Sequence, residues 1–175
     1  MGVQVPSRAV LIFNPKSGKG KATHLAKYFA EQWKKFQKTE LWIRPTTSVQ
    51  DLKKAATDPI YHNRIKIFMG GDGTFSIAMS ALFKQNQFKA LENPVAFLPA
   101  GTGNSFLRDF KIHSFEDACK KFFAAKKPIP LSAVFLKCFQ QDAKPFECVS
   151  LNIVGTGIIP KIADFAHSHR YLGHA

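Results

Sequence analysis

With 175 residues, of which 45% are hydrophobic and 21% charged, the chain has the composition of a folded globular protein and not of a disordered one. Its formal net charge of +13 indicates an anionic partner, which could be nucleic acid, a membrane surface or a phosphate-rich ligand, unless the lysines only solvate helix faces. No segment reaches the roughly 18 consecutive apolar residues of a membrane span, and the first eight residues lack the basic and apolar regions of a secretory signal.

Strand and helix patterns alternate along the first 127 residues. Short apolar runs predict strands at residues 9–13, 40–44, 65–69 and 95–98. Helices are predicted by apolar residues three and four positions apart or by serine caps. They cover residues 21–38, 75–84 and 114–125, with one more helix that begins at residue 48 and a short one that ends at residue 108. This alternation predicts an α/β fold with a parallel sheet and helices on both faces, which we assign to residues 1–127.

The pattern changes after residue 127. Two strands are predicted at residues 129–139 and 146–154, joined by the polar turn 140–145, which is typical of an antiparallel hairpin. A helix is predicted at residues 160–171. Because two strands and a helix make a poor core, we expect residues 128–175 to be the opening part of a β domain that is truncated here.

Three glycine-rich loops follow predicted strands. They are Asn14–Gly20, Gly70–Thr74 and Pro99–Asn104. In open α/β sheets the carboxyl ends of the strands form the ligand-binding edge. Glycines there let backbone N–H groups approach a phosphate, and the helix that follows presents the positive end of its dipole. Together the loops predict a phosphate-binding site.

Two common phosphate motifs are excluded. A P-loop needs a glycine five residues before its Gly-Lys pair, where this chain has Phe13 or Pro15. A dinucleotide fingerprint needs a further glycine or alanine, where the chain has Ser76 or Phe106. The alternative, that the glycines only close tight turns, does not explain Asp72, since a phosphate repels a carboxylate unless a cation or a proton transfer is involved.

These loops, together with residues 152–157, resemble the diacylglycerol kinase catalytic domain family, which includes sphingosine and ceramide kinases. The Gly-Gly-Asp-Gly-Thr string is shared with NAD kinases, whereas Pro-Ala-Gly-Thr-Gly-Asn favours the lipid kinases. The resemblance implies an N-terminal α/β domain and a C-terminal β-sandwich, with ATP in the cleft between them.

The resemblance also implies the roles of single residues. Asp72 matches an acid that is often assigned a proton-transfer role. The residues that would hold ATP are Asn14, Gly18, Thr46, Gly70, Gly71, Gly73, Thr74, Thr102 and Arg170. We predict no metal ligand among the residues of this chain, although Mg²⁺ is expected as a cofactor together with ATP.

The chain departs from the family pattern at several positions. Ile77 stands where the family commonly has a glutamate. Sphingosine kinases have two acids where this chain has Lys161 and Ala163, with Asp164 one step out of register, which weakens the case for a sphingoid substrate. The chain also ends where the family continues, and diacylglycerol kinases place a further catalytic carboxylate and a metal site in that part.

The expected activity is that of a lipid kinase in lipid metabolism or phospholipid biosynthesis. It would transfer the γ-phosphate of MgATP to a hydroxyl of diacylglycerol or of a sphingoid-like lipid. A nucleotide-binding fragment with little turnover and a NAD kinase-like enzyme remain as alternatives, and the sequence does not specify the lipid.

The expected partners follow from charge and from missing motifs. The basic surface predicts peripheral association with an anionic membrane, and no nucleic-acid recognition motif is present. The chain has three cysteines, Cys119, Cys138 and Cys148, which lack metal-ligand spacing. Their odd number argues against a disulfide framework and favours a reducing cytoplasm.

Overall fold

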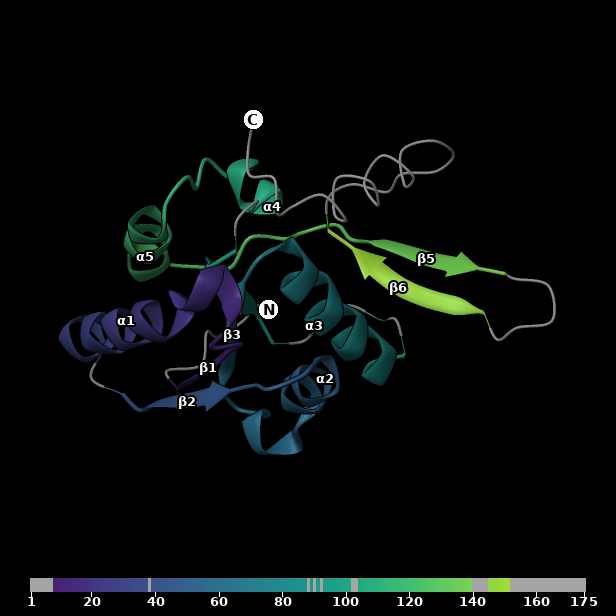
Figure 1. Ribbon diagram of the computed structural model, residues 1–175, viewed down its shortest axis with the longest axis horizontal. Helices are drawn as coiled ribbons and strands as arrows, with labels where there is room; N and C mark the ends of the chain where they lie inside the picture. Colours follow the sequence, from purple (N-terminus) through teal and green to yellow (C-terminus); the bar gives the residue numbers. More distant parts are fainter. Residues whose placement is uncertain are drawn as a thin grey trace.

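The structure is a computed structural model that describes residues 8–37, 39–87, 89, 91, 93–101, 104–139 and 145–151. Its centre is a four-stranded sheet with helices around it (Figure 1). The strands lie in the order β2-β1-β3-β4 and are all parallel. The strands are β1 (Ala9–Phe13), β2 (Leu41–Pro45), β3 (Ile65–Gly70) and β4 (Val95–Pro99). The predicted parallel sheet is therefore confirmed.

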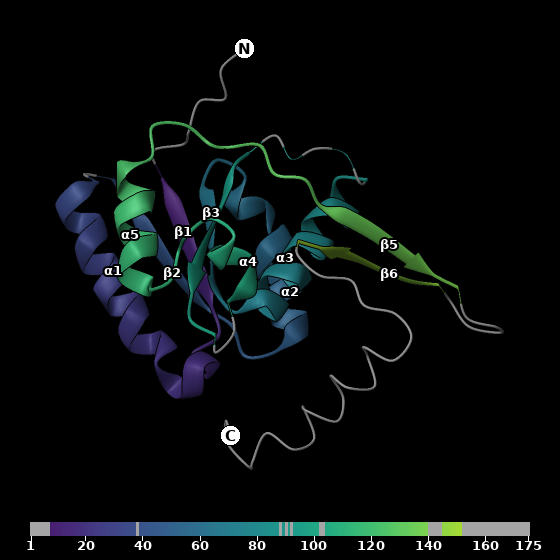
Figure 2. The ribbon, with the colours of Figure 1, turned by 90° about the horizontal axis from the view of Figure 1, so that it is seen from above.

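Helices cover both faces of this sheet, as predicted (Figure 2). The helices are α1 (Ala22–Phe36), α2 (Val49–Thr57), α3 (Asp72–Gln85), α4 (Ser105–Arg108) and α5 (Phe115–Ala124). Apolar residues of α1 and α5 pack on one face, and those of α2 and α3 pack on the other. All five residues of β1 are buried because this central strand is covered on both sides.

The predicted serine caps are present. The hydroxyl of Ser48 accepts a hydrogen bond from the Asp51 N–H (3.0 Å), and that of Ser114 accepts one from the Asp117 N–H (3.0 Å). Each bond satisfies an N–H group that has no partner inside the helix. These two caps fix where α2 and α5 begin.

The predicted antiparallel hairpin is also present, formed by β5 (Val134–Cys138) and β6 (Phe146–Ser150). Its base packs on α3. The Ser76 hydroxyl donates to the Val149 carbonyl (2.7 Å), and the Val149 N–H donates to the Ser80 hydroxyl (2.8 Å). The hydroxyls of α3 thus take the place of a neighbouring strand at this point of β6. A domain boundary at residue 127 stays a prediction.

Some boundaries differ from the predicted ones. The helix predicted at residues 75–84 begins at Asp72, so most of the Gly-Asp-Gly-Thr string is the first turn of α3 and not a free loop. The apolar pattern misses this turn because Asp72, Gly73 and Thr74 bury no large apolar side chain. The strand predicted at 129–139 is confined to Val134–Cys138, and short 3₁₀ turns form at Ser17–Gly20 and Pro59–Tyr61.

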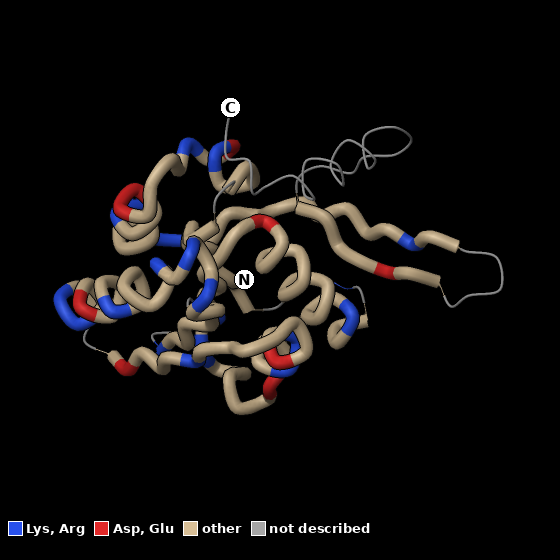
Figure 3. The backbone as a smooth tube through the Cα atoms, in the orientation of Figure 1, with Lys and Arg blue, Asp and Glu red and all other residues tan. Residues whose placement is uncertain are grey.

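The basic residues are spread over the molecule (Figure 3). Each of the five α-helices described carries at least one Lys or Arg, so positive charge lies on both helical layers. Within the described ranges, no helix combines the length and the apolar character needed to cross a membrane.

Candidate functional site

The loops after β1 and β3 leave the sheet in opposite directions. The chain after β1 continues into α1 on one face, whereas the chain after β3 continues into α3 on the other. Because β1 and β3 are adjacent, the sheet has its topological switch point between their carboxyl ends. Ligands of open α/β sheets bind in the crevice at such a point.

Glycines let the three predicted loops pack directly on one another. A Cβ atom on Gly18 would lie 2.4 Å from the Ala100 carbonyl oxygen, and one on Gly101 would lie 2.5 Å from the Gly71 Cα. Gly18 also has a φ of +60°, in the left-handed region that favours glycine. The structure thus brings the loops together and adds a reason for their glycines, namely contact between backbones.

Asp72 connects the second loop to the third. Its Oδ2 atom accepts a hydrogen bond from the Ser105 N–H (2.9 Å), and its Oδ1 atom accepts one from the Phe106 N–H (3.1 Å). The carboxylate therefore caps the first turn of α4. Sequence reasoning missed this role, because the two partners lie more than 30 positions further along the chain.

Asn104 shapes the end of the third loop. Its side chain accepts a hydrogen bond from the Gly101 N–H (3.2 Å) and donates one to the Gly101 carbonyl (2.8 Å). Its φ of 54° is unusual for a residue other than glycine, although asparagine tolerates this region better than most. Thr102, between these two residues, lies outside the described part of the chain.

Asn14 and Thr46 lie where β1 and β2 end. The Asn14 side chain accepts a hydrogen bond from the Lys16 N–H (2.9 Å). Thr46 is only 2% exposed, and its hydroxyl donates to the Phe13 carbonyl (3.1 Å). The Thr46 side chain is at the predicted edge, but it is turned into the protein.

The loop that carries Thr46 is fixed by Asp51. The Thr47 N–H, which donates to the Asp51 carboxylate (2.9 Å), and the Arg44 guanidinium hold the pKa of that carboxyl below its usual range. Asp51 lies in the first turn of α2, so these contacts join the end of β2 to the start of the next helix.

The remaining predicted residues lie at the start of α3, except for one. A Cβ atom on Gly70 would lie 2.5 Å from the Thr74 hydroxyl oxygen, so Thr74 folds back over the end of β3. Gly73 has no atom within 4 Å of a Cβ position and faces open space. Arg170, like Thr102, falls outside the described residues.

A cavity of about 410 Å³ lies beside the joined loops, on the side of α1 and α5. Its polar lining includes Lys19, Lys21 and His113, which sequence analysis did not single out. Lys19 has a φ of 57°, a strained value for a lysine. The only available signal was the lysine-rich composition of the first loop, and lysines are common on any surface.

The described residues do not form a metal centre of their own. Within them, no three His, Cys, Asp or Glu side chains are grouped as a metal ion would require. The two oxygen atoms of Asp72 already accept backbone hydrogen bonds. A divalent cation at this edge would therefore need ligands from a bound phosphate compound.

The profile of the diacylglycerol kinase catalytic domain matches residues 8–134 of the chain. A crystal structure of a diacylglycerol kinase from Bacillus anthracis str. Sterne has a similar fold, with a TM-score of 0.57 and 24% identity, covering 67% of this chain and 39% of its own. Two further structures from the same organism match with the same TM-score and identity, over 41% and 38% of their chains. No curated protein sequence gives a match. The chain thus spans about two fifths of the length of the solved structures that it matches.

Proposed function

This chain belongs to the diacylglycerol kinase catalytic domain family, and we propose that it is a phosphotransferase that moves the γ-phosphate of ATP to a hydroxyl group of a lipid. The observation that carries the proposal is the meeting of three glycine-rich loops at the switch point of the sheet. Phosphoryl transfer depends mainly on positioning and on neutralising the charge of the phosphate oxygens. A site of backbone N–H groups and lysines suits both needs.

The proposed site assigns the phosphates to the start of α3 and the neighbouring loops. The first N–H groups of α3 have no partners inside the helix, and the positive end of its dipole favours an anion. Gly73 leaves open space there, and Lys19 and Lys21 add positive charge from the first loop. Mg²⁺ would be held chiefly by the phosphates of ATP, where it neutralises their charge.

Asp72 is the proposed proton acceptor. As the lipid oxygen bonds to the γ-phosphorus atom and the bond to the β-phosphate oxygen breaks, the hydroxyl loses its proton, and the carboxylate would take it. Each oxygen of Asp72 accepts one backbone hydrogen bond and keeps a second lone pair. The contacts with α4 fix the position of this group.

The lipid that accepts the phosphate belongs to the same proposal. We take it to be diacylglycerol or a sphingoid-like lipid, which the protein would reach at an anionic membrane surface, bound peripherally through its basic residues. The high net charge of +13 supports binding to an anionic membrane, and a lipid substrate resides in such a membrane.

Hydrogen exchange and a transfer assay test the two parts separately. ATP with Mg²⁺ should slow exchange at Gly70–Thr74 and Pro99–Asn104, and unchanged exchange at both loops would refute the site. Radiolabelled ATP should then label diacylglycerol or sphingosine in mixed vesicles. Binding without transfer would make the chain a nucleotide-binding unit, and transfer to NAD instead would favour a NAD kinase-like activity.

Replacing Asp72→Asn tests the proton acceptor. The amide keeps one acceptor oxygen but turns an NH₂ group toward the other N–H, so we expect unfolding to become easier by about 1–3 kcal/mol. Transfer should fall by about 10²-fold or more, while ATP binding is retained at a temperature where the variant is folded. The exposed Asp109→Asn is the matched control. Equal transfer by Asp72→Asn would leave this residue a purely structural role.

A further inference from the structure

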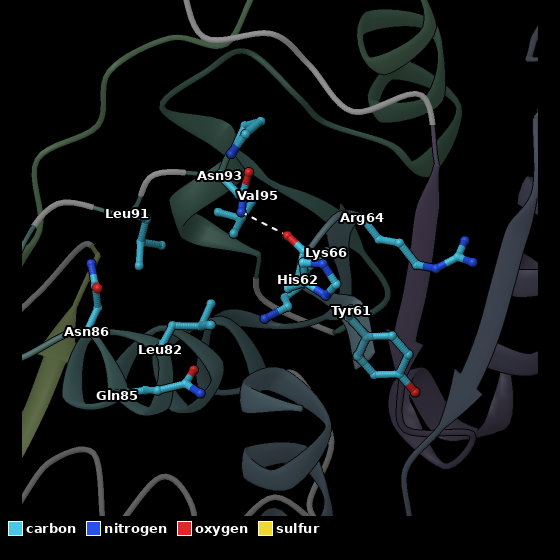
Figure 4. Close-up of a pocket in the computed structure, with 11 residues that line it drawn as sticks. Tyr61, His62, Arg64, Lys66, Leu82, Gln85, Asn86, Leu91, Asn93 and Val95 are labelled. Atoms are coloured by element: carbon cyan, nitrogen blue, oxygen red, sulfur yellow. Dashed lines mark hydrogen bonds between the residues drawn. The ribbon is translucent and has the colours of Figure 1, made fainter. Parts of the chain in front are cut away.

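A second cavity lies at the opposite edge of the sheet from the glycine loops, near the start of β3 and β4 (Figure 4). Its volume is about 160 Å³. Its walls combine apolar and polar side chains, among them Leu82, Leu91, His62, Gln85, Asn93 and Lys66. It shares no residue with the site described above.

Lys66 lies in an apolar row of the sheet. It pairs with Val10 of β1 and Val95 of β4, and it points to the same face as Phe68, two positions further along β3. In Figure 4 its side chain extends toward Leu82. A valine or leucine would fit this row better, so the charge at this position calls for a reason.

The ammonium group of Lys66 lacks a partner in the described part of the chain. None of the ion pairs and hydrogen bonds there involves its Nζ atom. Burial lowers the pKa of Lys66, and the charge of Asp58 offsets this only in part. The Asp58 carboxylate itself accepts a hydrogen bond from the Ile60 N–H (3.0 Å).

The other polar groups of the cavity are fixed by local contacts. The Asn93 side chain donates to the His62 carbonyl (3.0 Å), and the Gln85 side chain donates to the Thr57 carbonyl (2.9 Å). The His62 ring holds its Nδ1 atom 2.9 Å from the Pro59 carbonyl oxygen. These contacts fix the walls of the cavity around a cation without a partner.

Arg64 is not the cation of this cavity, although it contributes to the rim. Its guanidinium lies over the Trp42 ring, 3.6 Å from the centroid, and donates to Glu40 (2.6 Å). In Figure 4 this group points away from Leu91 and Asn93. Its Nε and Nη1 atoms are buried and have no hydrogen-bond partner among the described residues, but they belong to this group, which is turned away from the cavity. Lys66 is therefore the cation that a ligand in the cavity would meet.

We propose that this cavity binds a small tetrahedral oxyanion, such as phosphate, through the Lys66 ammonium group. An oxyanion would give the ammonium the charge-assisted hydrogen bonds that it lacks. The volume suits a phosphate group better than a whole nucleotide, so we expect this site to differ in ligand from the one at the glycine loops. The phosphate could be free in solution or be carried by a small monoester, because both present the same group.

The test is a titration of the isotope-labelled 175-residue chain with inorganic phosphate, followed by nuclear magnetic resonance at constant ionic strength. Saturating MgATP occupies the proposed nucleotide site. The amide signals of His62, Lys66 and Asn93 should then still shift with phosphate. A parallel titration with glycerol 3-phosphate distinguishes the sources: a tighter response than with phosphate identifies a monoester site, and a weaker one identifies free phosphate.

Lys66→Met should weaken phosphate binding at these amides roughly tenfold or more, the effect of losing one charge-assisted hydrogen bond. Lys66→Arg should restore most of it, and the exposed Lys84→Met should leave it unchanged. Because methionine suits an apolar row, Lys66→Met should fold at least as well as the original chain. Either a lack of phosphate-dependent shifts at these amides, or equal shifts in Lys66→Met, would overturn the proposal.

Discussion

Gly101 illustrates how little room the joined loops leave for a side chain. A Cβ atom there would lie 2.5 Å from the Gly71 Cα, and the neighbouring atom is backbone, which cannot turn aside as a side chain can. Gly101→Ala should therefore separate the two loops and reduce the free energy of unfolding by about 1–3 kcal/mol. Denaturation in urea measures this change.

The control for this variant is Gly73→Ala. Gly73 lies in the first turn of α3 and has open space around its Cβ position. Alanine is the better helix former, so this change should leave stability unchanged or raise it by up to about 1 kcal/mol. If both variants lost the same stability, direct contact between the loops would not be the reason for Gly101.

Cys119 and Cys138 should differ in reactivity. Burial raises the pKa of the Cys119 thiol from 9.0 to about 12, whereas Cys138 is exposed. The thiolate is the reactive form. A thiol reagent at pH 8 should thus label Cys138 quickly and Cys119 only when the protein opens. Mass spectrometry of the labelled peptides measures the two rates, and equally fast labelling would contradict the burial of α5.

The same thiol makes stability depend on alkaline pH. Because the pKa of Cys119 is raised in the folded state, the folded protein keeps the thiol proton above about pH 9, where the unfolded chain releases it. The contribution of this thiol to the free energy of unfolding is fully present below pH 9 and is lost as the pH rises toward 12. Cys119→Ala should remove this part of the pH dependence, although it also costs packing at every pH.

At the scale of elements, the contact between α3 and β6 can be tested by removing one hydroxyl. The Ser80 hydroxyl accepts the Val149 N–H, and among the described residues no strand lies on that side of β6 to replace it. Ser80→Ala should speed exchange of the Val149 amide hydrogen and cost about 1 kcal/mol of stability. The exposed Ser132→Ala is the control, and unchanged exchange at Val149 would mean that apolar packing alone holds the hairpin.

Elements set by local pattern were predicted well from the sequence. The strand β1 is a continuous apolar run, and β3 is one apart from Lys66, because both faces of each strand are covered. The caps at Ser48 and Ser114 depend on residues three positions away. In each case the signal can be read from one short segment of the sequence.

Features that depend on contacts between distant parts of the chain were not predicted. The first turn of α3 starts at Asp72 without an apolar residue to mark it, and the partners of its carboxylate lie on α4. The hairpin docks through Ser76 and Ser80, two residues that look like ordinary helix surface in the sequence. The sequence predicted that the three glycine-rich loops lie at one edge of the sheet. It did not predict that their backbones touch.

At the scale of the whole molecule, the positive charge predicts salt-dependent binding to membranes. Each Lys or Arg near an anionic surface contributes about 1 kcal/mol, within a Debye length of about 8 Å at physiological ionic strength. Sedimentation with vesicles rich in phosphatidylserine should show binding that falls steeply as salt increases. Vesicles of phosphatidylcholine alone are the control, and equal binding to them would make the lysines plain solubilising charge.

The way α3 holds β6 also restricts how the molecule can move. A helix of 14 residues is a rod of about 21 Å. Its first turn faces the proposed phosphates. One and two turns later, the hydroxyls of Ser76 and Ser80 form hydrogen bonds with the backbone of β6. The hairpin therefore cannot tilt as an independent arm while the loop stays still. Any such tilt must either carry α3, and with it the N–H groups at Gly73 and Thr74, or first break both hydroxyl contacts.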